Sequence, residues 1–162
     1  AKHADGVLIN ASHPDDFAWA SDRVAEGKEE RPDERGDFDV AAYASVSVAE
    51  DADAAREVAR QPVAFIAAGA APPVLDRHGL DADAAETIGD AIERGDFGEA
   101  FDAVTPAMID AFSVAGTPED VADRIEKVLQ YADSFVAGTP VGPDQEDAIA
   151  LLSAALDQAT RE

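Results

Sequence analysis

The chain has 162 residues, 46% of them apolar, so it is long enough for one domain with its own hydrophobic core, and it has no apolar run of the ~18 residues that span a membrane. The absence of cysteine excludes disulfides, thiol nucleophiles and thiolate metal sites. A net charge of −23 argues against binding to nucleic-acid phosphates, which depends on Lys and Arg.

The acidic residues predict a protein adapted to a salt-rich cytoplasm. The chain holds 22 Asp and 13 Glu against three lysines, and the acids are spread along its whole length. In molar salt the Debye length falls to about 3 Å, which screens repulsion between surface carboxylates. Because no basic and apolar leader opens the chain, we expect a halophilic cytoplasmic protein, with an acidic mesophilic protein as the alternative.

The first predicted strand is residues 6–10, GVLIN, a short apolar run with β-branched residues. Ser12 or His13, followed by Pro14, would end this strand and begin a helix. The apolar residues expected on one face of that helix are Phe17, Ala20 and Val24. A charged loop is predicted over 28–39.

The second predicted strand is residues 40–48, VAAYASVSV, which has small and β-branched residues on both faces, as a buried parallel strand does. A helix follows, and Pro62 predicts a break or kink in it before 63–69.

Residues 70–113 contain no convincing strand and predict a series of short helices. The residues expected to separate these helices are Gly79, Gly95 and the pair Thr105-Pro106. A capped helix, a strand at 134–138 and a last helix complete the chain. The apolar stripe expected on the last helix is Ile149, Leu152, Leu156 and Ala159.

Strand and helix alternation predicts parallel strands joined by right-handed crossovers. Three strands cannot close a barrel, and a (β/α)8 barrel needs about 250 residues. The sequence therefore predicts either a small open α/β domain or part of a larger one. The second option is favoured because the chain lacks an initiator Met and enters a strand almost at once.

Five blocks resemble one protein family, in the same order and over nearly the whole chain from about residue 3. They are ADGVLINASHPDDF (4–17), VAFIAAGAAPPVLDRHGL (63–80), IGDAIERGDFG (88–98), VTPAMIDAFSVAGTPED (104–120) and VAGTPVGPDQEDAI (136–149). The family is the coenzyme F-420-dependent methylenetetrahydromethanopterin reductases of the bacterial-luciferase-like superfamily. The resemblance is to the C-terminal half of that family, and the acidic composition suits a halophilic archaeal member.

This resemblance implies one partial TIM-barrel domain over 1–162, with 6–10, 40–48 and 134–138 as strands six, seven and eight and 70–113 as a helical insertion between strand seven and its helix. The implied reaction is hydride transfer from reduced F-420 to a methylene-tetrahydropterin, either methanopterin or folate. The family's catalytic acid and most of its cofactor-phosphate ligands lie in the N-terminal half, so the catalytic residues are unknown in this chain.

The resemblance also implies an oligomer, or an N-terminal half-barrel partner. Two alternatives to the reductase remain. One is another luciferase-like dehydrogenase or monooxygenase that uses F-420 or FMN. The other is a catalytically inert fragment that serves as an assembly piece.

In a TIM barrel, functional residues collect at the C-terminal ends of strands. Asn10, Ser12 and His13 follow the first strand and are candidates to bind substrate or cofactor. Alternatively, Asn10 and Ser12 satisfy backbone groups of the turn, and Ser12 or His13 caps the next helix.

Two further candidates come from the second strand and the helical region. Ser47 is expected to line the pocket because it is nearest the C-terminal end of its strand, whereas Tyr43 is expected to face the helices or bond to backbone. Arg77 and His78 would meet an anionic group of the pterin or cofactor, or Arg77 would pair with a neighbouring carboxylate. The three isolated histidines predict no metal site.

The motif VAGTP occurs twice, at 114–118 and 136–140. In the first copy Thr117, Pro118 and Asp120 form a helix start that needs no ligand. The second copy follows a strand, and its loop is expected to line a pterin or deazaflavin ring. The candidate residues of this loop are Gly138, Thr139, Pro140 and Gly142. The acids after Pro143 argue against a phosphate site there.

Overall fold

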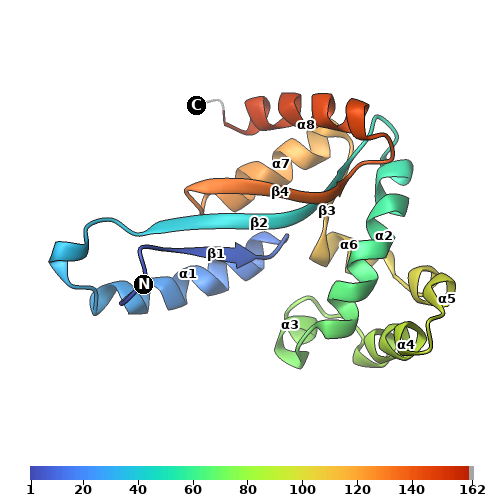
Figure 1. Ribbon diagram of the computed structural model, residues 1–162, viewed down its shortest axis with the longest axis horizontal. Coiled ribbons are helices and arrows are strands. Elements are labelled where there is room, and N and C mark those ends of the chain that lie inside the picture. Colours follow the sequence, from blue (N-terminus) through green and yellow to red (C-terminus); the bar gives the residue numbers. More distant parts are fainter. Residues whose placement is uncertain (161–162) are drawn as a thin grey trace.

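The structure, a computed structural model, describes residues 1–160. Four parallel strands form one sheet: β1 (Gly6–Asn10), β2 (Asp39–Val48), β3 (Val114–Gly116) and β4 (Ser134–Val141). The strands run side by side across the molecule in Figure 1 and point toward the same end. The prediction of an α/β fold with a parallel sheet is confirmed.

The long strand β2 organises the sheet. β1 and β4 both pair with Ala41, Ala42 and Tyr43, so they lie on opposite edges of β2. β3 and β4 both pair with Ser47, so β3 continues the edge that β1 begins. The outer edges of β1 and β4 carry no further strand among residues 1–160.

Three helices cover one face of the sheet: α1 (Pro14–Glu29), α7 (Pro118–Leu129) and α8 (Gln145–Ala159). The even-numbered residues of β2, from Ala42 to Val48, are fully buried against this layer. The opposite face is open, since Leu8 of β1 is 59% exposed and Val136 of β4 is 44% exposed. Strands with one covered face normally carry polar residues on the other, so this exposed apolar face is unusual.

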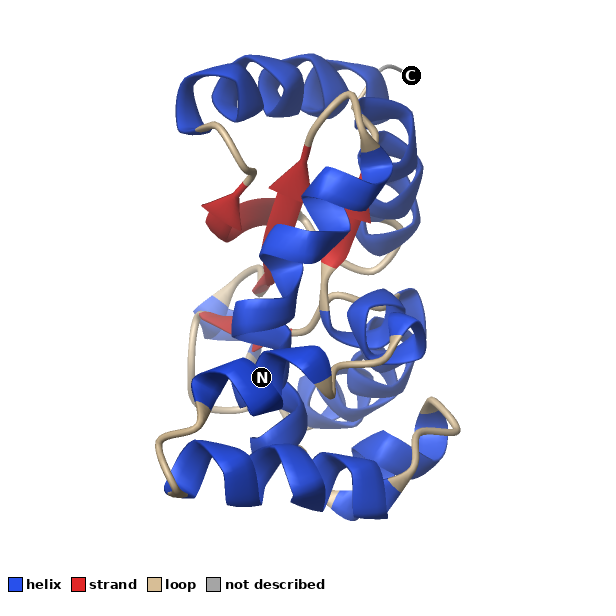
Figure 2. Cartoon of the chain, turned by 90° about the vertical axis from the view of Figure 1, so that its right-hand side faces the viewer, coloured by secondary structure: helices blue, strands red, loops and turns tan. Residues whose placement is uncertain are grey.

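The remaining helices form a unit with its own hydrophobic core, here termed the helical cluster. It comprises α2 (Ala52–Gly69), α3 (Pro72–Arg77), α4 (Ala82–Glu93), α5 (Phe97–Asp102) and α6 (Pro106–Phe112). It extends from the end of the sheet toward which the strands point. Figure 2, seen from that end, shows α8 above the strands and the helical cluster in front of and below them. The regular structure within 70–113 is helical, as predicted.

The structure differs from the local predictions at three places. The predicted break at Pro62 does not occur, since α2 runs from Ala52 to Gly69 and buried residues on both sides of the proline hold the helix against the core. β3 was not predicted, since three residues are too few to show alternation. Ile149 is 55% exposed, and Ala148 takes its place in the buried stripe of α8.

The predicted helix starts agree with the structure. Thr117 and Asp120 form a capping box, in which each side chain accepts the backbone N–H of the other residue. His13 caps α1, and its Nδ1 accepts the N–H of Asp15 at 3.2 Å. Gly79 and Gly95 have φ values of 61° and 78°, which explains why these positions end helices.

Candidate functional site

A cavity of about 370 Å³ lies at the C-terminal end of β1, between α1 and the helices α2 and α3. We term it the β1 cavity. The polar and aromatic residues that line it are Asn10, Ser12, Asp16, Trp19, Arg77 and Phe112. Its position fits the rule that the ends of parallel strands, where loops meet helix starts, form binding sites.

Asp16 connects the two walls of this cavity. Its carboxylate accepts a hydrogen bond from Nη1 of Arg77, and its second oxygen lies 3.0 Å from Nε2 of His78. The three side chains are largely buried, at 13% exposed for Asp16, 21% for Arg77 and 5% for His78. An ion pair at this depth is screened less by salt than one at the surface.

Trp19 lies on the same side of the cavity. The guanidinium carbon of Arg77 is 5.0 Å from the centre of the indole ring, which is a cation–π distance. Trp19 is nevertheless 52% exposed, so part of its ring surface is free of protein contact.

The histidine that caps α1 packs against this group. The rings of His13 and His78 meet edge to face at 4.9 Å, and His78 makes a similar contact with Phe112 at 6.0 Å. Burial lowers the pKa of His13 below 6.5, and the nearby charge of Arg124 lowers it further. His13 is therefore held toward its neutral form.

Ser12 is buried, and its side chain makes a hydrogen bond that connects two elements of the fold. Its hydroxyl donates to the carbonyl of Phe112 at 3.1 Å, which ties the end of β1 to α6. Arg124 donates to the carbonyls of Asp110 and Ser12 from the other side. Asn10, in contrast, is exposed at the end of β1.

The odd-numbered residues of β2 face away from α1, α7 and α8. Tyr43 lies on this face over Gly138, since its hydroxyl would be only 2.6 Å from a Cβ added there. Of the two predicted arrangements, a bond to backbone or a position toward the sheet-covering helices, the second is therefore wrong. Ser45 donates to the carbonyl of Thr139 at 3.1 Å. Ser47 is fully buried, and within residues 1–160 its hydroxyl is the one buried side-chain polar atom that has no hydrogen-bond partner.

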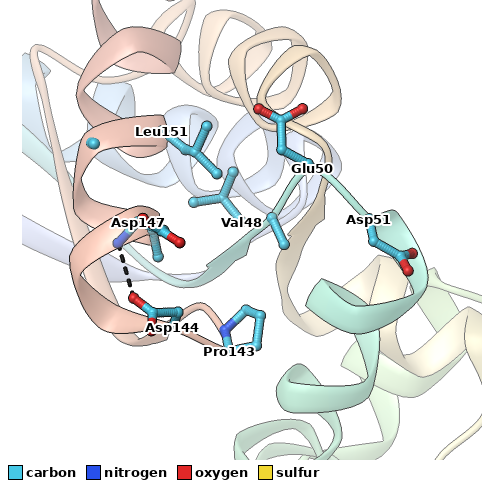
Figure 3. A pocket seen from close by; sticks show the side chains of 10 residues that line it. Val48, Glu50, Asp51, Pro143, Asp144, Asp147 and Leu151 are labelled. Carbon is cyan, nitrogen blue, oxygen red and sulfur yellow. Dashed lines mark hydrogen bonds between the residues drawn. The ribbon is translucent and has the colours of Figure 1, made fainter.

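A second cavity, of about 490 Å³, lies where the chain leaves β2 and β4, and we term it the β4-loop cavity. Figure 3 shows Glu50, Asp51, Asp144 and Asp147 around it. Within residues 1–160, no basic side chain lines it. Asp144 already accepts the N–H groups of Glu146 and Asp147, so this helix start is satisfied by the chain itself.

Gly138, Thr139 and Pro140 lie in β4 rather than in a loop as predicted, and Gly142 follows the strand. Both glycines are close to other parts of the protein. A Cβ at Gly142 would lie 2.4 Å from the carbonyl oxygen of Val48 and 2.6 Å from Cβ of Ala148. Packing therefore accounts for glycine at 138 and 142. Pro140 follows a cis peptide bond, in the segment where β4 carries an extra residue relative to β2.

The structure divides the predicted site residues into two groups. Asn10, Ser12, His13, Arg77 and His78 gather at or beside the β1 cavity.

 Arg77 and His78 lie 65 and 66 positions after Ser12 in the sequence, so only the fold brings this pair close to Ser12. The other group lies around the ends of β2 and β4, and its members are Ser47, Gly138, Thr139, Pro140 and Gly142.

Two residues of the β1 cavity were not predicted from the sequence. Asp16 follows Pro14 and Asp15 in the first turn of α1, where acidic residues commonly stabilise a helix start, so nothing local marks it as a partner for Arg77. Trp19 is the only tryptophan of the chain, and this rarity is the signal that could have marked it as a site residue. The alternative in which Arg77 pairs with a carboxylate is the one that the structure shows.

Two features are absent from residues 1–160: a cluster of metal-binding side chains and a helix that could cross a membrane. No group of three or more His, Cys, Asp or Glu side chains is arranged to hold a metal ion. No helix in this part of the chain is both long enough and apolar enough to cross a membrane.

Comparison with known proteins gives consistent matches. A model of the luciferase-like monooxygenase family matches residues 1–137. The 5,10-methylenetetrahydromethanopterin reductase of Archaeoglobus fulgidus is 46% identical over 157 residues, which are 94% of this chain and 47% of that protein. The protein of the same name from Methanopyrus kandleri is 47% identical over 150 residues, which are 92% of this chain and 43% of that protein.

A solved structure agrees with these matches. It is the coenzyme F-420-dependent tetrahydromethanopterin reductase from Methanopyrus kandleri, with a TM-score of 0.85 and 46% identity over 93% of this chain and 44% of that chain. The chain thus spans about half the length of the relatives it matches. Since the family model covers most of its residues, the chain belongs to the luciferase-like monooxygenase family.

Proposed function

We propose that this chain is the C-terminal part of an F-420-dependent oxidoreductase. The reaction is transfer of a hydride from reduced F-420 to a methylene-tetrahydropterin, which gives the methyl form. The observation that carries this proposal is 46–47% identity, over 92–94% of the chain, to proteins named 5,10-methylenetetrahydromethanopterin reductase. The names of these relatives favour methanopterin over folate as the one-carbon carrier.

The proposal includes a place in a TIM barrel. β1, β2 and β4 would be strands six, seven and eight, and the segment 70–113 would be an insertion after strand seven. Two observations support this: the outer edges of β1 and β4 carry no strand among residues 1–160, and Leu8 and Val136 are exposed on the open face. Unpaired edges and apolar patches mark surfaces that another segment covers. The partner proposed here is an N-terminal half-barrel, and oligomer formation stays a prediction.

The β1 cavity fits the ring of F-420 or of a pterin better than a phosphate tail. Trp19 and Phe112 offer apolar walls, and Asn10 and Arg77 offer hydrogen-bond donors for ring oxygens. The β4-loop cavity, lined by four acids, does not fit a phosphate group. F-420 supplies the hydride, and the chain's residues orient the rings and exclude water. The same walls would accept the ring of FMN, which is the alternative cofactor.

The function can be tested by adding the half-barrel that the chain lacks relative to its relatives. The chain is purified in molar KCl, alone and together with the N-terminal half of the Archaeoglobus fulgidus reductase. Oxidation of reduced F-420 is then followed with methylene-tetrahydromethanopterin or methylene-tetrahydrofolate. We expect turnover by the combined halves and none by the chain alone.

Each alternative has its own outcome in this experiment. Turnover by the chain alone would contradict the proposal that the catalytic residues lie in another segment. Turnover with reduced FMN but not with reduced F-420 would favour a flavin-dependent member of the family. Stable assembly of the halves without turnover with either cofactor would favour an inert assembly piece. The cytoplasmic location stays a prediction.

A further inference from the structure

We propose that Asp16 is a positioning residue, which holds Arg77 across the gap between α1 and α3 so that the guanidinium binds a ring oxygen of a planar heteroaromatic ligand in the β1 cavity. The proposal rests on the proposed function for the identity of that ligand, a tetrahydropterin or the deazaflavin ring of F-420. Both rings carry a carbonyl oxygen on a flat heterocycle, and this shared feature is what Arg77 would recognise.

Both carboxylate oxygens of Asp16 are engaged. Asp16 uses one oxygen for Nη1 of Arg77 and the other for Nε2 of His78, at 3.0 Å. With both oxygens engaged and the side chain 13% exposed, the carboxylate has little freedom to turn. It therefore fixes the direction of the guanidinium, through a hydrogen bond strengthened by charge.

The guanidinium of Arg77 uses one of its three nitrogens for a hydrogen bond within the described residues. Among residues 1–160, Nε and Nη2 of Arg77 have no hydrogen-bond acceptor, although the side chain is only 21% exposed and lines the cavity. A guanidinium has five N–H donors, so several remain for a ligand.

Arg31 is an arginine whose guanidinium is used fully by the protein itself. Its side chain is 7% exposed, and all three nitrogens donate to backbone carbonyls. The acceptors are Ala1, Ala4, Arg35, Gly36 and Asp37. Among residues 1–160, Nη2 and Nε of Arg77 instead have no protein acceptor, so they are available to a ligand.

Aromatic and apolar side chains lie beside the guanidinium of Arg77. Arg77 stacks on Trp19, which is 52% exposed, and the apolar side chains of Ile66, Val74 and Phe112 line the same cavity. Its volume of about 370 Å³ lies within the range of small-molecule sites. Apolar walls with one directed cationic donor suit a flat ring that carries an oxygen acceptor.

Trp19 provides the test, because it is the only tryptophan in the chain. Its emission is measured in molar KCl during titration with tetrahydrofolate and, separately, with F-420, and N-acetyltryptophanamide corrects for light absorbed by the ligand. We expect a saturable change with at least one of the two, and the ligand that produces it identifies the ring. Asp16→Asn should weaken binding about tenfold. Asp22→Asn, an exposed change of the same type on α1, should bind as the unmodified chain does.

Far-ultraviolet circular dichroism checks whether Asp16→Asn folds. If it does not, a second variant keeps the test decisive. Arg77→Met retains the contact between Asp16 and His78 and should also weaken binding about tenfold. Unchanged binding by either folded variant would overturn the proposal, and so would the absence of any saturable change in the unmodified chain.

Turnover by the combined halves separates this proposal from the proposed function. There, Asp16→Asn should raise KM about tenfold and leave kcat nearly unchanged, since a positioning residue acts on binding. No turnover by the unmodified halves, together with weaker binding by Asp16→Asn, would contradict the proposed function alone. Normal turnover with an unchanged KM in Asp16→Asn would contradict the positioning role alone.

Discussion

Nε2 of His78 lies 3.0 Å from Oδ2 of Asp16, although the two residues are 62 positions apart. Asp16 belongs to the first turn of α1, and His78 ends α3 of the helical cluster. The core of the helical cluster and the core beneath α1 are separate. This contact, with the ion pair of Arg77 beside it, therefore joins the two units through polar side chains rather than through continuous apolar packing.

His13 predicts that stability depends on pH. Burial lowers its pKa in the folded chain below 6.5, and the charges of Arg124 and His78 act in the same direction, whereas Asp15 and Asp16 act in the opposite one. The unfolded chain then binds the proton more tightly, so the free energy of unfolding should fall as pH drops below about 6.5 and through the folded-state pKa.

Urea unfolding at a series of pH values checks this prediction. His13→Asn should flatten the pH dependence in that window, because asparagine still caps the helix but does not titrate. The matched control is His3→Asn, at an exposed position near the amino end. A pH dependence that is the same in His13→Asn as in the unmodified chain would show that His13 is not its source.

Two isoleucines of the sheet-covering helices should differ sharply in their contribution to stability. Ile125 of α7 is fully buried, whereas Ile149 of α8 is 55% exposed. Ile125→Ala should lower the free energy of unfolding by about 2–5 kcal/mol, and Ile149→Ala should change it by less than about 0.5 kcal/mol. Equal losses in chemical unfolding would mean that Ile149 is covered in solution, as it would be by a second chain.

Gly142 should not tolerate a side chain. An added Cβ would lie 2.4 Å from the carbonyl oxygen of Val48, and a backbone atom cannot move aside easily. Gly142→Ala should cost about 1–3 kcal/mol. Gly69→Ala is the control, since nothing lies within 4 Å of its added Cβ and alanine favours the end of α2 by up to about 1 kcal/mol. Thermal unfolding that ranks the two variants the other way round would contradict this reading of the loop.

The charge of −23 predicts that the fold requires salt. Dialysis from molar KCl to low salt should reduce the helical circular dichroism signal, because repulsion between carboxylates is no longer screened. Sucrose is the control, since it favours compact states without screening charge. An unchanged spectrum at low salt would exclude halophilic adaptation, and full recovery in sucrose would show that screening is not the cause.

The local sequence determined most of the elements of this fold. The strands at 6–10, 40–48 and 134–138 and the helical character of 70–113 follow from short-range patterns, as does the capping box at Thr117, since each depends on residues close together in the chain. The three residues of β3 lacked such a pattern, and they form a strand because Val46–Val48 offers them a partner.

The local sequence determined only part of the candidate site. The sequence marked Asn10, Ser12, His13, Arg77 and His78, because they follow a strand or stand out as basic residues in an acidic chain. Tertiary structure alone decided that Asp16 would join Arg77 to His78 and that Trp19 would lie beneath the guanidinium. The physical reason is that an ion pair between residues about 60 positions apart depends on how α3 packs against α1, and no local pattern encodes that packing.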